Sequence, residues 1–412
     1  MSLKLGYLVP EFPGQTHMFF SREIDRLRSM GVAVQLISTR PPPRAVISHD
    51  WAQQAQLETI YLFRGLSFSP LFDLLKAFLR QGPKAWFRCF RSFFSAEGLT
   101  LRGRFKLLGF MLFGSKLALL AQENDLEHIH VHSCSDAAHV AMYAKLMADV
   151  PYSITLHGPL GDYGPNQKQK WKNAAFAIVI TKKLVKEIQK SLSGFLPPSI
   201  YTAPMGVNEN IFQRSTPYQP WNGQGPCEIF SVGRLNICKG HDDLIKAVKN
   251  LRGRGFDARL KIAGQDEQGG TGYRVDLQKL IESLEMEPFV ELLGAVSEHR
   301  VKRGICESHI FALASLDEPL GVAIMEAMAL EVPVIIARSG GVMELVDHDV
   351  DGILVPPRDP KALADAMEQI LKDPSLAQRL SHMSRRKIVE NFHDRRSADV
   401  LEIGIKSLPL EG

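Results

Sequence analysis

Two glutamates separated by seven residues, Glu318 and Glu326, bracket a predicted loop-to-helix junction. The run Leu320-Gly321-Val322 between them predicts a helix start near Leu320. The first N–H groups of a helix and its dipole favour an anion, and Gly321 would let a diphosphate approach the backbone. Glu326, further into the helix, is placed to accept hydrogen bonds from a ribose diol. Taken alone, the same spacing also fits an N-terminal acid and a surface acid on an ordinary helix.

Two cations lie upstream, in the loop that follows the strand-like run 228–232. Gly233 opens this loop, which presents Arg234 and Lys239. The guanidinium fork and the ammonium point charge are suited to neutralising a leaving diphosphate together. Singly, each is more often a solvated surface charge.

Both groups follow short apolar runs that alternate with helical stretches, an order typical of a parallel sheet in an α/β fold. The strand-like runs are 3–9, 32–38, 128–132, 152–157, 176–181, 200–203, 228–232, 258–263, 309–314 and 334–337. We therefore predict two doubly wound, Rossmann-like domains that face a central cleft, with ligands beyond the carboxyl ends of the strands. The predicted boundaries are an N-terminal domain 1–208, a linker 209–227 and a C-terminal domain 228–390. A last helix within 391–412 is expected to cross back to the first domain.

Residues 64–116 form a basic insertion in the first domain. It contains ten Lys or Arg and two acidic residues, net +8, which leaves −4 for the rest of the chain. Five aromatic residues recur there at helical spacing: Trp86, Phe87, Phe90, Phe93 and Phe94. One interpretation is a helix lying on an anionic membrane surface. The other is a helical pair with its aromatic face on the core and a solvated basic face, and both remain open.

Composition excludes several classes of protein. A net charge of +4 with 45% hydrophobic residues argues against disorder and gives no global reason to expect a nucleic-acid partner. The five cysteines contain no C-x-x-C pair, which favours a reducing cytoplasm over a disulfide framework or a structural zinc site. The N-terminal run reads as a buried strand and not as a signal peptide. The longest strongly apolar stretch, Leu107 to Gly114, is short for a membrane span.

The motifs of the second half resemble those of glycosyltransferase family 4, the retaining group 1 glycosyl transferases with the GT-B fold, and bacterial polysaccharide or colanic-acid-type members in particular. They are Gly233-Arg234-Leu235 with Lys239-Gly240, Ile262-Ala263-Gly264, Glu318 to Ala329, Pro333, Gly340 to Val346 and Gly352 to Val355. The first half matches more loosely, at Pro10 with Phe12-Pro13, Glu23-Ile24 ahead of Gly31, Leu156-His157-Gly158, and Gly206-Val207 with Phe212.

The resemblance implies a role for each matching residue. Arg234 and Lys239 would hold the donor diphosphate, Glu326 the ribose and Glu318 the donor sugar hydroxyls. His157 would point at the reaction centre from the first domain. The remaining implied nucleotide-binding residues are Gly14, Gly233, Leu320, Gly321 and Val322. A Lys-x-Gly-Gly loop found in glycogen-synthase-like relatives is replaced here by residues 12–17, so the acceptor side does not carry over.

Two patterns raise the question of a metal. His128, His130 and His132 alternate along one predicted strand and share a face, but similar strands occur in the resembled family without a metal. Asp347, Asp349 and Asp351 repeat an Asp-x-Asp spacing within a predicted turn. Because cations and a helix N-terminus already neutralise the diphosphate, we expect no metal and no cofactor.

The predicted function is therefore transfer of a hexose from a UDP- or GDP-sugar to a polysaccharide or lipid-linked glycan, with retention, in the cytoplasm or at the inner face of the membrane. Two alternatives remain: a sugar-nucleotide epimerase of the same fold, or a catalytically silent partner of a polysaccharide assembly complex. A dehydrogenase is disfavoured because no Gly-x-Gly-x-x-Gly follows the first strand.

Overall fold

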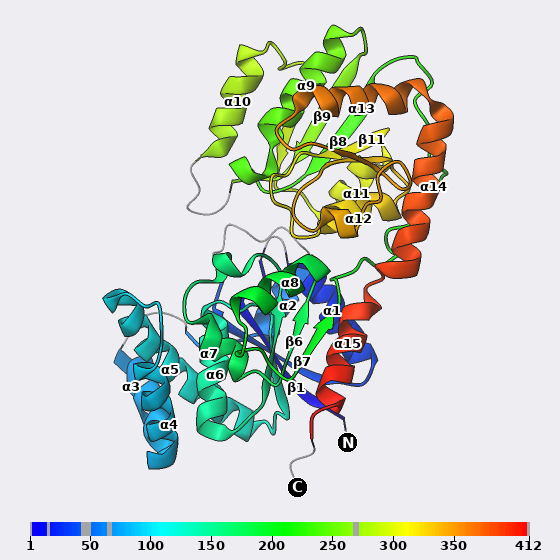
Figure 1. Cartoon of the computed structure of the whole chain (residues 1–412). Helices are drawn as coiled ribbons and strands as arrows, with labels where there is room; N and C mark the ends of the chain where they lie inside the picture. Colours follow the sequence, from blue (N-terminus) through cyan, green and yellow to red (C-terminus); the bar gives the residue numbers. More distant parts are fainter. Residues whose placement is uncertain (1, 15–16, 43–50, 64–67, 267–271, 410–412) are drawn as a thin grey trace. The chain divides into compact units, whose positions relative to one another are not determined.

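The computed structural model of the 412-residue chain describes residues 2–14, 17–42, 51–63, 68–266 and 272–409, with no side-chain description for 68–71. It contains two compact units (Figure 1). Unit 1 consists of Met1–Pro204 and Arg395–Gly412, and unit 2 of Met205–Asp394. Each unit has its own sheet and is described by itself.

Unit 1 is built on a parallel sheet with the order β3-β2-β1-β4-β5-β6-β7. Its strands are β1 Lys4–Glu11, β2 Ala33–Arg40, β3 Ile60–Tyr61, β4 His128–Val131, β5 Tyr152–Leu156, β6 Phe176–Val179 and β7 Ser199–Thr202. Its helices are α1 Met18–Ser29, α2 Trp51–Glu58, α3 Phe68–Arg80, α4 Gly82–Phe94, α5 Leu101–Glu123, α6 Asp136–Ala148, η2 Leu160–Tyr163, α7 Gln167–Lys172, α8 Lys182–Ser191 and α15 Arg395–Lys406. The strand order reverses between β1 and β4, which is where ligands bind in such sheets.

Unit 2 has a parallel sheet with the order β10-β9-β8-β11-β12-β13, which reverses between β8 and β11. Its strands are β8 Cys227–Val232, β9 Ala258–Ala263, β10 Val290–Gly294, β11 Ile310–Leu313, β12 Val334–Ala337 and β13 Ile353–Val355. Its helices are η3 Ile237–Lys239, α9 His241–Gly253, α10 Tyr273–Ser283, α11 Glu298–Cys306, α12 Val322–Ala329, η4 Val342–Glu344, α13 Pro360–Lys372 and α14 Pro374–Asn391.

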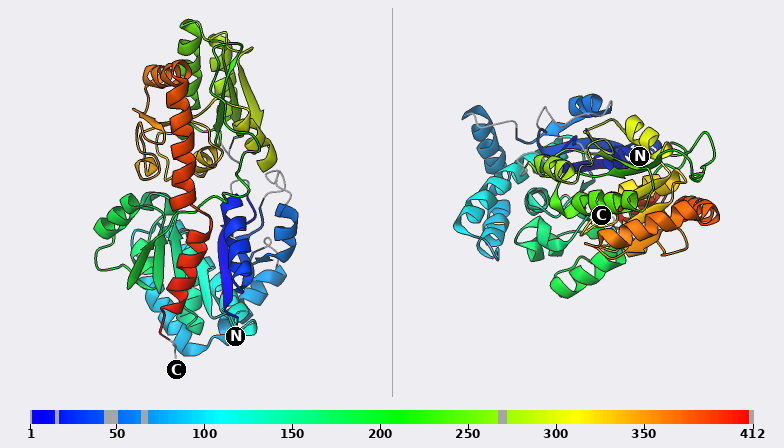
Figure 2. Two further views of the ribbon diagram at one scale, coloured as in Figure 1. Left: turned by 90° about the vertical axis from the view of Figure 1, so that its right-hand side faces the viewer. Right: turned by 90° about the horizontal axis from the view of Figure 1, so that it is seen from above.

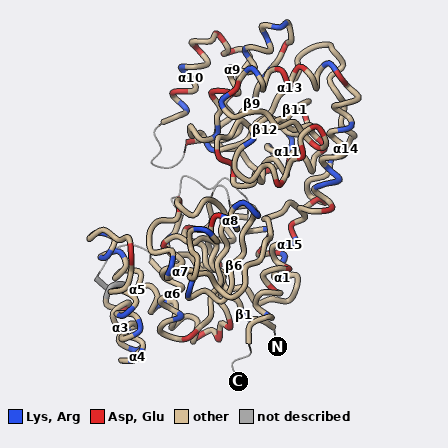
Figure 3. The backbone as a smooth tube through the Cα atoms, in the orientation of Figure 1, with Lys and Arg blue, Asp and Glu red and all other residues tan. Residues whose placement is uncertain are grey.

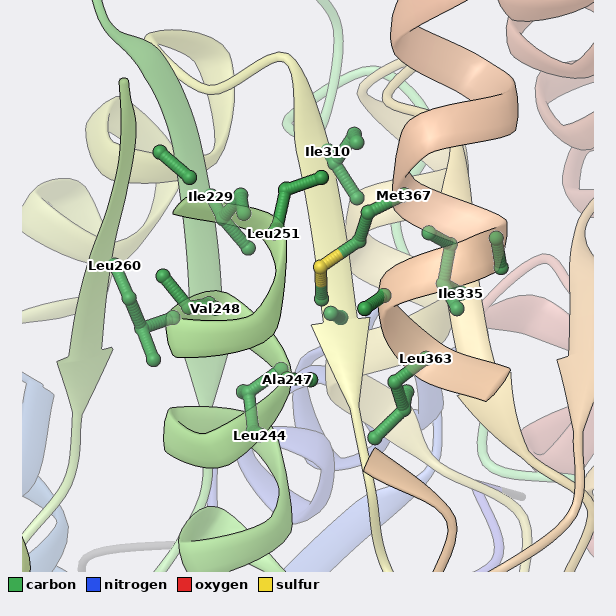
Figure 4. Close-up of a cluster of buried hydrophobic side chains, with 14 of the residues drawn as sticks. Ile229, Leu244, Ala247, Val248, Leu251, Leu260, Ile310, Ile335, Leu363 and Met367 are labelled. Atoms are coloured by element: carbon green, nitrogen blue, oxygen red, sulfur yellow. The ribbon is translucent and has the colours of Figure 1, made fainter. Parts of the chain in front are cut away.

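The core of unit 2 lies between its sheet and the helices α9 and α13. Leu244, Val248 and Leu251 recur at helical spacing on α9 and face strand residues such as Ile229 and Leu260 (Figure 4). Each of these side chains is almost fully buried. This apolar contact holds the carboxyl ends of β8 and β11 next to each other, and the candidate site grows from those ends.

The prediction of two Rossmann-like domains is confirmed, but three strands were not predicted: β3, β10 and β13. β3 has two residues and β13 three, too few to show a periodic pattern. In β10 the register shifts between Leu292 and Gly294, which interrupts the alternation. Such short strands form because neighbouring strands supply their hydrogen-bond partners.

The segment proposed as a linker, 209–227, packs on unit 2. Tyr218 is 2% exposed and its hydroxyl donates to the carbonyl of His309 at 2.8 Å. The guanidinium of Arg385 donates to the carbonyls of Phe212 and Ala329, both at 2.6 Å. Burial of a large aromatic side chain accounts for this packing.

The chain passes between the units twice, and the two passes are hydrogen-bonded to each other. The Val207 N–H donates to the Phe392 carbonyl at 2.9 Å, and the Asp394 N–H donates to the Val207 carbonyl at 3.2 Å. A Cβ atom on Gly206 would lie 2.3 Å from the carbonyl oxygen of His393. Glycine is therefore required at position 206 for the two segments to approach this closely.

The last helix, α15, belongs to unit 1, where it packs against α1 and β6 (Figures 1 and 2). Gly404 makes this close contact possible, since a Cβ there would lie 2.6 Å from the ring of Phe176. Ala398 and Leu401 are fully buried on the same helix face.

The basic insertion forms three helices, α3, α4 and α5, and not a helical pair. Arg64 and the rest of 64–67 lie outside the described residues. By length and composition α5 qualifies as a membrane span, with a mean hydropathy of 1.3 over its most apolar window, of which 39% is buried in the protein. The apolar stretch is thus longer than the sequence reading of 107–114 allowed. Its buried side, including Met111, Leu117 and Ala118, packs mainly against α6.

Candidate functional site

The loops after β8 and β9 in unit 2 touch through two glycines. Gly264 has φ 155°, and a Cβ on it would lie 1.8 Å from the carbonyl oxygen of Gly233, so only glycine fits. The Leu235 N–H donates to the Gln265 carbonyl at 2.9 Å, and the Leu235 side chain is buried. Together these contacts fix the backbone on both sides of Arg234, whose side chain is exposed.

Lys239 and Glu318 form an ion pair, with 2.6 Å between Nζ and Oε2. Gly240 brings them together, because a Cβ there would lie 2.1 Å from the carbonyl oxygen of Ala314 at the end of β11. The main chain of Glu318 is held on both sides: its N–H donates to Ser339 Oγ at 3.3 Å and its carbonyl accepts from Gly341 at 2.9 Å. Two residues 79 positions apart are thus locked at the switch point of the sheet.

The helix α12 begins at Val322 and not near Leu320, with Gly321 as its N-cap at φ 99°. Leu320 is instead buried at 4% exposure in the turn before the helix. A Cβ on Gly321 would lie 2.5 Å from the side chain of Ile324, in addition to the strain of its backbone conformation. No side chain caps the helix and its first turn carries no acid. Its N-terminus therefore suits an anion.

Glu326 lies one turn into α12 and is 9% exposed. The ordinary helix-surface interpretation of Glu326 is therefore wrong, because the side chain is buried against the unit. Unit 2 thus brings Gly233, Arg234, Lys239, Glu318, Gly321, Val322 and Glu326 to the carboxyl ends of β8 and β11. Their roles in binding a donor stay predictions.

In unit 1, His157 directly follows β5 and contacts His132, which directly follows β4. The distance from His132 Nδ1 to His157 Nε2 is 3.2 Å. The rings of Phe19 and Phe20 lie 5.6 Å from the His157 ring, centroid to centroid. Burial lowers the pKa of His157 to about 3, with a further decrease from the neighbouring His132. His157 is therefore neutral at pH 7 and suited to hydrogen bonding rather than to charge stabilisation.

Gly14 lies before α1, and its carbonyl accepts from the His17 N–H at 3.1 Å. A Cβ on Gly14 would lie 2.7 Å from the His17 ring, so a side chain would force that ring to move. Gln15 and Thr16 lie outside the described residues. The predicted contact of Gly14 with phosphate stays a prediction.

His128 and His130 alternate along β4, and His132 directly follows the strand, but the ring nitrogens of all three contact neighbouring side chains. His128 Nε2 and His130 Nδ1 both lie 2.7 Å from Ser153 Oγ, and His130 Nε2 lies 2.8 Å from Thr155 Oγ1. In the described part of the chain no group of three or more metal-ligating side chains is found. These histidines link β4 to β5 through hydroxyl groups.

Two of the three aspartates in the Asp-x-Asp turn share one lysine. Lys387 Nζ lies 2.7 Å from Asp347 Oδ2 and 3.0 Å from Asp351 Oδ2. Asp349 adopts φ 61° and its N–H donates to Gly352, as in a turn. Burial raises the pKa of Asp351, although the Lys387 ammonium acts in the opposite direction.

The sequence analysis assigned no role in the site to three buried residues with polar groups: His241, Tyr7 and Glu23. His241 Nε2 lies 3.3 Å from the carbonyl oxygen of Arg234. In unit 1, Glu23 Oε2 lies 2.8 Å from His132 Nε2 and accepts from the hydroxyl of Tyr7 at 2.6 Å. Glu23 was noted only as part of a motif, and nothing in the local pattern indicated that it approaches a residue 109 positions away.

Comparisons with known proteins bear on the fold and on the class of the protein. Residues 220–387 match the family model "Glycosyl transferases group 1". The putative colanic acid biosynthesis glycosyltransferase WcaL of Escherichia coli is 31% identical over 214 residues, 50% of each chain. The alpha-D-kanosaminyltransferase of Streptomyces kanamyceticus is 26% identical over 311 residues, 68% of this chain and 78% of that protein. The first curated relatives are matched over only part of their length, 40% for an uncharacterized glycosyltransferase of Methanocaldococcus jannaschii.

Solved structures match over almost the whole chain. Anabaena Alr3699/HepE, crystallised with UDP and glucose, aligns with a TM-score of 0.74 at 18% identity and covers 99% of this chain and 100% of its own. A glycosyltransferase from Rickettsia africae aligns with a TM-score of 0.71 at 17% identity, again covering 99% and 100%. The protein therefore has the two-domain fold of GT-B glycosyltransferases, and its second unit matches the group 1 glycosyl transferase family.

Proposed function

We propose that this protein is a glycosyltransferase of family 4 that moves a hexose from a nucleotide-diphosphate sugar, UDP- or GDP-linked, to a polysaccharide or lipid-linked glycan with retention of configuration. The observation that carries the proposal is the pairing of Lys239 with Glu318 beside the uncapped N-terminus of α12. Cation, carboxylate and helix N-terminus are the groups needed for the diphosphate and the sugar of such a donor. Relatives named as glycosyltransferases support the same class.

Catalysis in this proposal consists of stabilising the leaving group. As the bond from the anomeric carbon to the diphosphate lengthens, negative charge grows on the phosphate oxygens. Arg234, Lys239 and the N-terminus of α12 bind that charge more strongly than they bind the ground state. The acceptor hydroxyl forms the new bond on the same face, and its proton passes to a phosphate oxygen of the leaving nucleoside diphosphate. Glu318 and His157 orient the sugar.

A divalent metal is not needed in this mechanism, because protein cations and a helix dipole perform its electrostatic role. The ion pair adds a second function for Lys239. Before the donor arrives, the ammonium compensates the buried Glu318 carboxylate, which is 9% exposed. When the diphosphate arrives, Lys239 exchanges one anionic partner for another and Glu318 becomes available to sugar hydroxyls.

We further propose that the protein works in the cytoplasm and binds the anionic inner face of the membrane through α3, α4 and α5. Large apolar side chains are exposed on these helices: Phe72, Leu75, Leu79, Phe87, Phe90, Phe94, Leu101 and Phe105. Exposed basic residues lie among them: Lys76, Arg80, Lys84, Arg91, Arg102 and Lys106. Figure 3 shows Lys and Arg along this part of unit 1.

Only part of the aromatic set packs on the protein: Trp86 and Phe93 are half-buried, and Trp86 Nε1 donates to the carbonyl of Phe78 at 2.8 Å. Ala85 and Cys89 face the protein and are at most 2% exposed, whereas Phe87 and Phe94 are 70% and 73% exposed. Apolar and basic side chains that are exposed on the same three helices suit the hydrocarbon edge and the anionic head groups of a bilayer. Each basic residue near such a surface adds roughly 1 kcal/mol at low salt.

The donor experiment tests the enzymatic proposal. We expect thermal stabilisation by one nucleotide sugar from a panel of UDP-, GDP- and ADP-sugars, and transfer from that donor to a glycan acceptor. Stabilisation without transfer to any acceptor, with production of an epimer from the donor alone, would favour the epimerase alternative. Failure to bind any nucleotide sugar would favour a silent partner.

Vesicle co-sedimentation tests the membrane proposal. The wild type is expected to sediment with anionic vesicles at low salt and to be released at high salt, since salt screens the attraction. The test variant carries Glu at Lys76, Lys84 and Arg91; Arg88 is kept because it pairs with Asp149 at 2.9 Å. The control carries Glu at the exposed Lys190, Lys279 and Arg300, with the same change in net charge. Equal sedimentation of the two variants would contradict this surface.

A further inference from the structure

Four side chains from four elements of unit 1 form one buried chain of polar contacts that ends at His157. Tyr7 comes from β1, Glu23 from α1, His132 follows β4 and His157 follows β5. The successive distances are 2.6 Å from Tyr7 Oη to Glu23 Oε2, 2.8 Å from Glu23 Oε2 to His132 Nε2, and 3.2 Å from His132 Nδ1 to His157 Nε2.

Burial increases away from the site. Tyr7 is 1% exposed, and Glu23 and His132 are each 2% exposed, whereas His157 is partly exposed. These three groups are almost fully buried, so the outer end of the chain, His157, is the one that can meet a ligand. An anionic carboxylate at the inner end needs donors on its oxygens to offset burial.

The Glu23 carboxylate determines which nitrogen of each histidine in this chain carries a proton. Tyr7 is a donor to Glu23 Oε2, and the nitrogen of His132 next to the same oxygen must present N–H and not a lone pair to a carboxylate. His132 Nε2 makes no hydrogen bond by geometry among the described residues, so its 2.8 Å contact with Glu23 Oε2 is electrostatic, and a carboxylate oxygen at that distance favours N–H over a lone pair on this nitrogen. His132 is then protonated at Nε2, so its Nδ1 accepts. His157 must donate from Nε2 and keeps a lone pair on Nδ1.

The imidazoles of His132 and His157 are both neutral near pH 7. Burial lowers the pKa of His132 well below its usual value and that of His157 to about 3. Each ring is therefore neutral near pH 7 and carries a single N–H, so its tautomer has a consequence for the partner. The other titratable rings nearby are His130, 4.5 Å from His132 between centroids, and His17, which lies close to Phe20.

The helix α1 holds both imidazoles in place. Glu23 lies one turn after Phe19 and Phe20 on this helix, and the ring of Phe20 lies 4.7 Å from that of His132 and 5.6 Å from that of His157. One rigid element therefore supplies the carboxylate that sets the protons and the aromatic rings that set the ring planes.

We propose that Glu23, acting through His132, is a positioning residue that fixes His157 as its Nε2–H tautomer and presents the Nδ1 lone pair to a hydroxyl of the donor sugar or acceptor. This proposal rests on the function proposed above for its ligand, but the tautomer itself does not. A hydroxyl can donate to that lone pair, and an ether or carbonyl oxygen cannot. His157 would thus select for a free hydroxyl at the sugar position that faces it.

The alternative is a purely structural role, in which the cluster stabilises unit 1 and the tautomer of His157 is immaterial. The chain offers a matched control for this. His128 is fully buried on the same strand, lies 2.7 Å from Ser153 Oγ, and is not part of the contacts that lead from Glu23 to His157. His128→Gln should cost stability without affecting His157.

The decisive measurement is the nitrogen NMR spectrum of histidine-labelled protein, with the His157 signals assigned from His157→Asn. The wild type is expected to show His157 protonated at Nε2 alone. In Glu23→Gln the amide can face His132 with either its oxygen or its NH₂ group, so His157 should become a mixture of tautomers. His132→Gln, which removes the acceptor at the Nδ1 position, should have the same effect, whereas His132→Asn keeps an amide oxygen near that position and should restore much of the wild-type tautomer.

Kinetics provide the second readout. Glu23→Gln and His132→Gln are expected to lower kcat by about tenfold, the low end for residues that support a functional histidine. The KM for the donor should change little, and His128→Gln should retain the wild-type kcat at a similar loss of thermal stability.

The proposal is overturned if His157 of the wild type is protonated at Nδ1, or if its tautomer is unchanged in both Glu23→Gln and His132→Gln. If Glu23→Gln does not fold, the pair His132→Gln and His132→Asn decides alone. Absence of turnover in the wild type with every donor would contradict the proposed function but leave the tautomer measurement intact, so the two failures are distinguishable.

Discussion

The two units present opposite kinds of chemistry at the carboxyl ends of their strands. Unit 2 offers charge: a lysine paired to a glutamate, an exposed arginine and an uncapped helix N-terminus. Unit 1 offers neutral imidazoles, supported by a carboxylate that is almost fully buried. Charged groups suit a diphosphate whose charge grows during reaction, whereas neutral donors and acceptors suit sugar hydroxyls. The comparison therefore assigns the charged groups of the proposed reaction to unit 2 and its neutral hydrogen-bonding groups to unit 1.

The sharpest test of this division is removal of a cation from unit 2. Arg234→Ala and Lys239→Ala are each expected to lower kcat by two to three orders of magnitude, about 3 to 4 kcal/mol, because these groups bind charge that develops in the transition state. Steady-state kinetics with a thermal unfolding control measure the effect. Lys249→Ala, at an exposed position on α9, is the matched control. Wild-type turnover in either test variant would remove it from the site.

Substitution of Glu326 and of Glu318 is expected to affect different kinetic quantities, nucleotide affinity for the first and kcat for the second. Glu326→Ala should weaken binding of the bare nucleoside diphosphate, since the ribose loses an acceptor in ground and transition states alike. Glu318→Ala should leave that affinity nearly unchanged and lower kcat, because its proposed partner is the sugar. Calorimetry with the nucleoside diphosphate separates them, and unchanged affinity in Glu326→Ala would exclude the ribose assignment.

His157→Ala is expected to have a smaller effect than loss of a cation. Removing one neutral hydrogen-bonding group costs about 1 to 1.5 kcal/mol, or roughly tenfold in kcat. Affinity for the nucleoside diphosphate should stay at the wild-type value, because the groups proposed to bind it belong to unit 2. A loss of nucleotide affinity equal to the loss of kcat would contradict the division between the units.

Lowering the pH should destabilise unit 1 more than unit 2. Five histidines of unit 1 have pKa values lowered by burial, His128, His130, His132, His139 and His157, against two in unit 2, His241 and His309. The unfolded chain takes up protons from pH 6.5 downward, while His128, His139 and His157 stay neutral in the folded state to about pH 3.

In that window the unfolded state binds more protons, so the free energy of unfolding falls as pH falls, by at most about 1.4 kcal/mol per pH unit for each group. Hydrogen exchange between pH 7 and pH 4 should show unit 1 losing protection first. His139→Gln should flatten the slope, and His382→Gln, at an exposed position, should not. Simultaneous loss in both units would show that other groups dominate.

Chelation should have the smallest effect of all. Transfer is expected to continue at the wild-type rate in EDTA, because unit 2 supplies the neutralising charge itself. Complete loss in EDTA with rescue by manganese or magnesium would redirect attention to Asp347 and Asp351, whose present partner is Lys387.

The division between the units also explains what the sequence revealed. The groups of unit 2 lie in short loops. Local backbone geometry requires glycines in these loops, such as Gly240 and Gly321, so the site can be recognised from short sequence motifs. Two α/β domains followed in the same way from alternating runs. The support of His157 is assembled from segments spread over 150 residues, and no local spacing encodes it. The exposure of Phe87 and Phe94 was equally invisible, since helical periodicity describes a face without saying what covers it.

The position of α15 has a consequence for synthesis. A chain emerging from the ribosome presents residues 1–204 before unit 2, yet the surface formed by α1 and β6 waits for residues 395–406, which are made after unit 2. Synthesis of unit 1 thus starts before that of unit 2 and finishes after it, and unit 2 is able to fold while its neighbour still lacks a helix. Deleting residues 395–406 would therefore damage the N-terminal half of the protein. A fragment that reproduces unit 1 must contain Arg395–Gly412 as well as Met1–Pro204, for instance by joining Pro204 to Arg395.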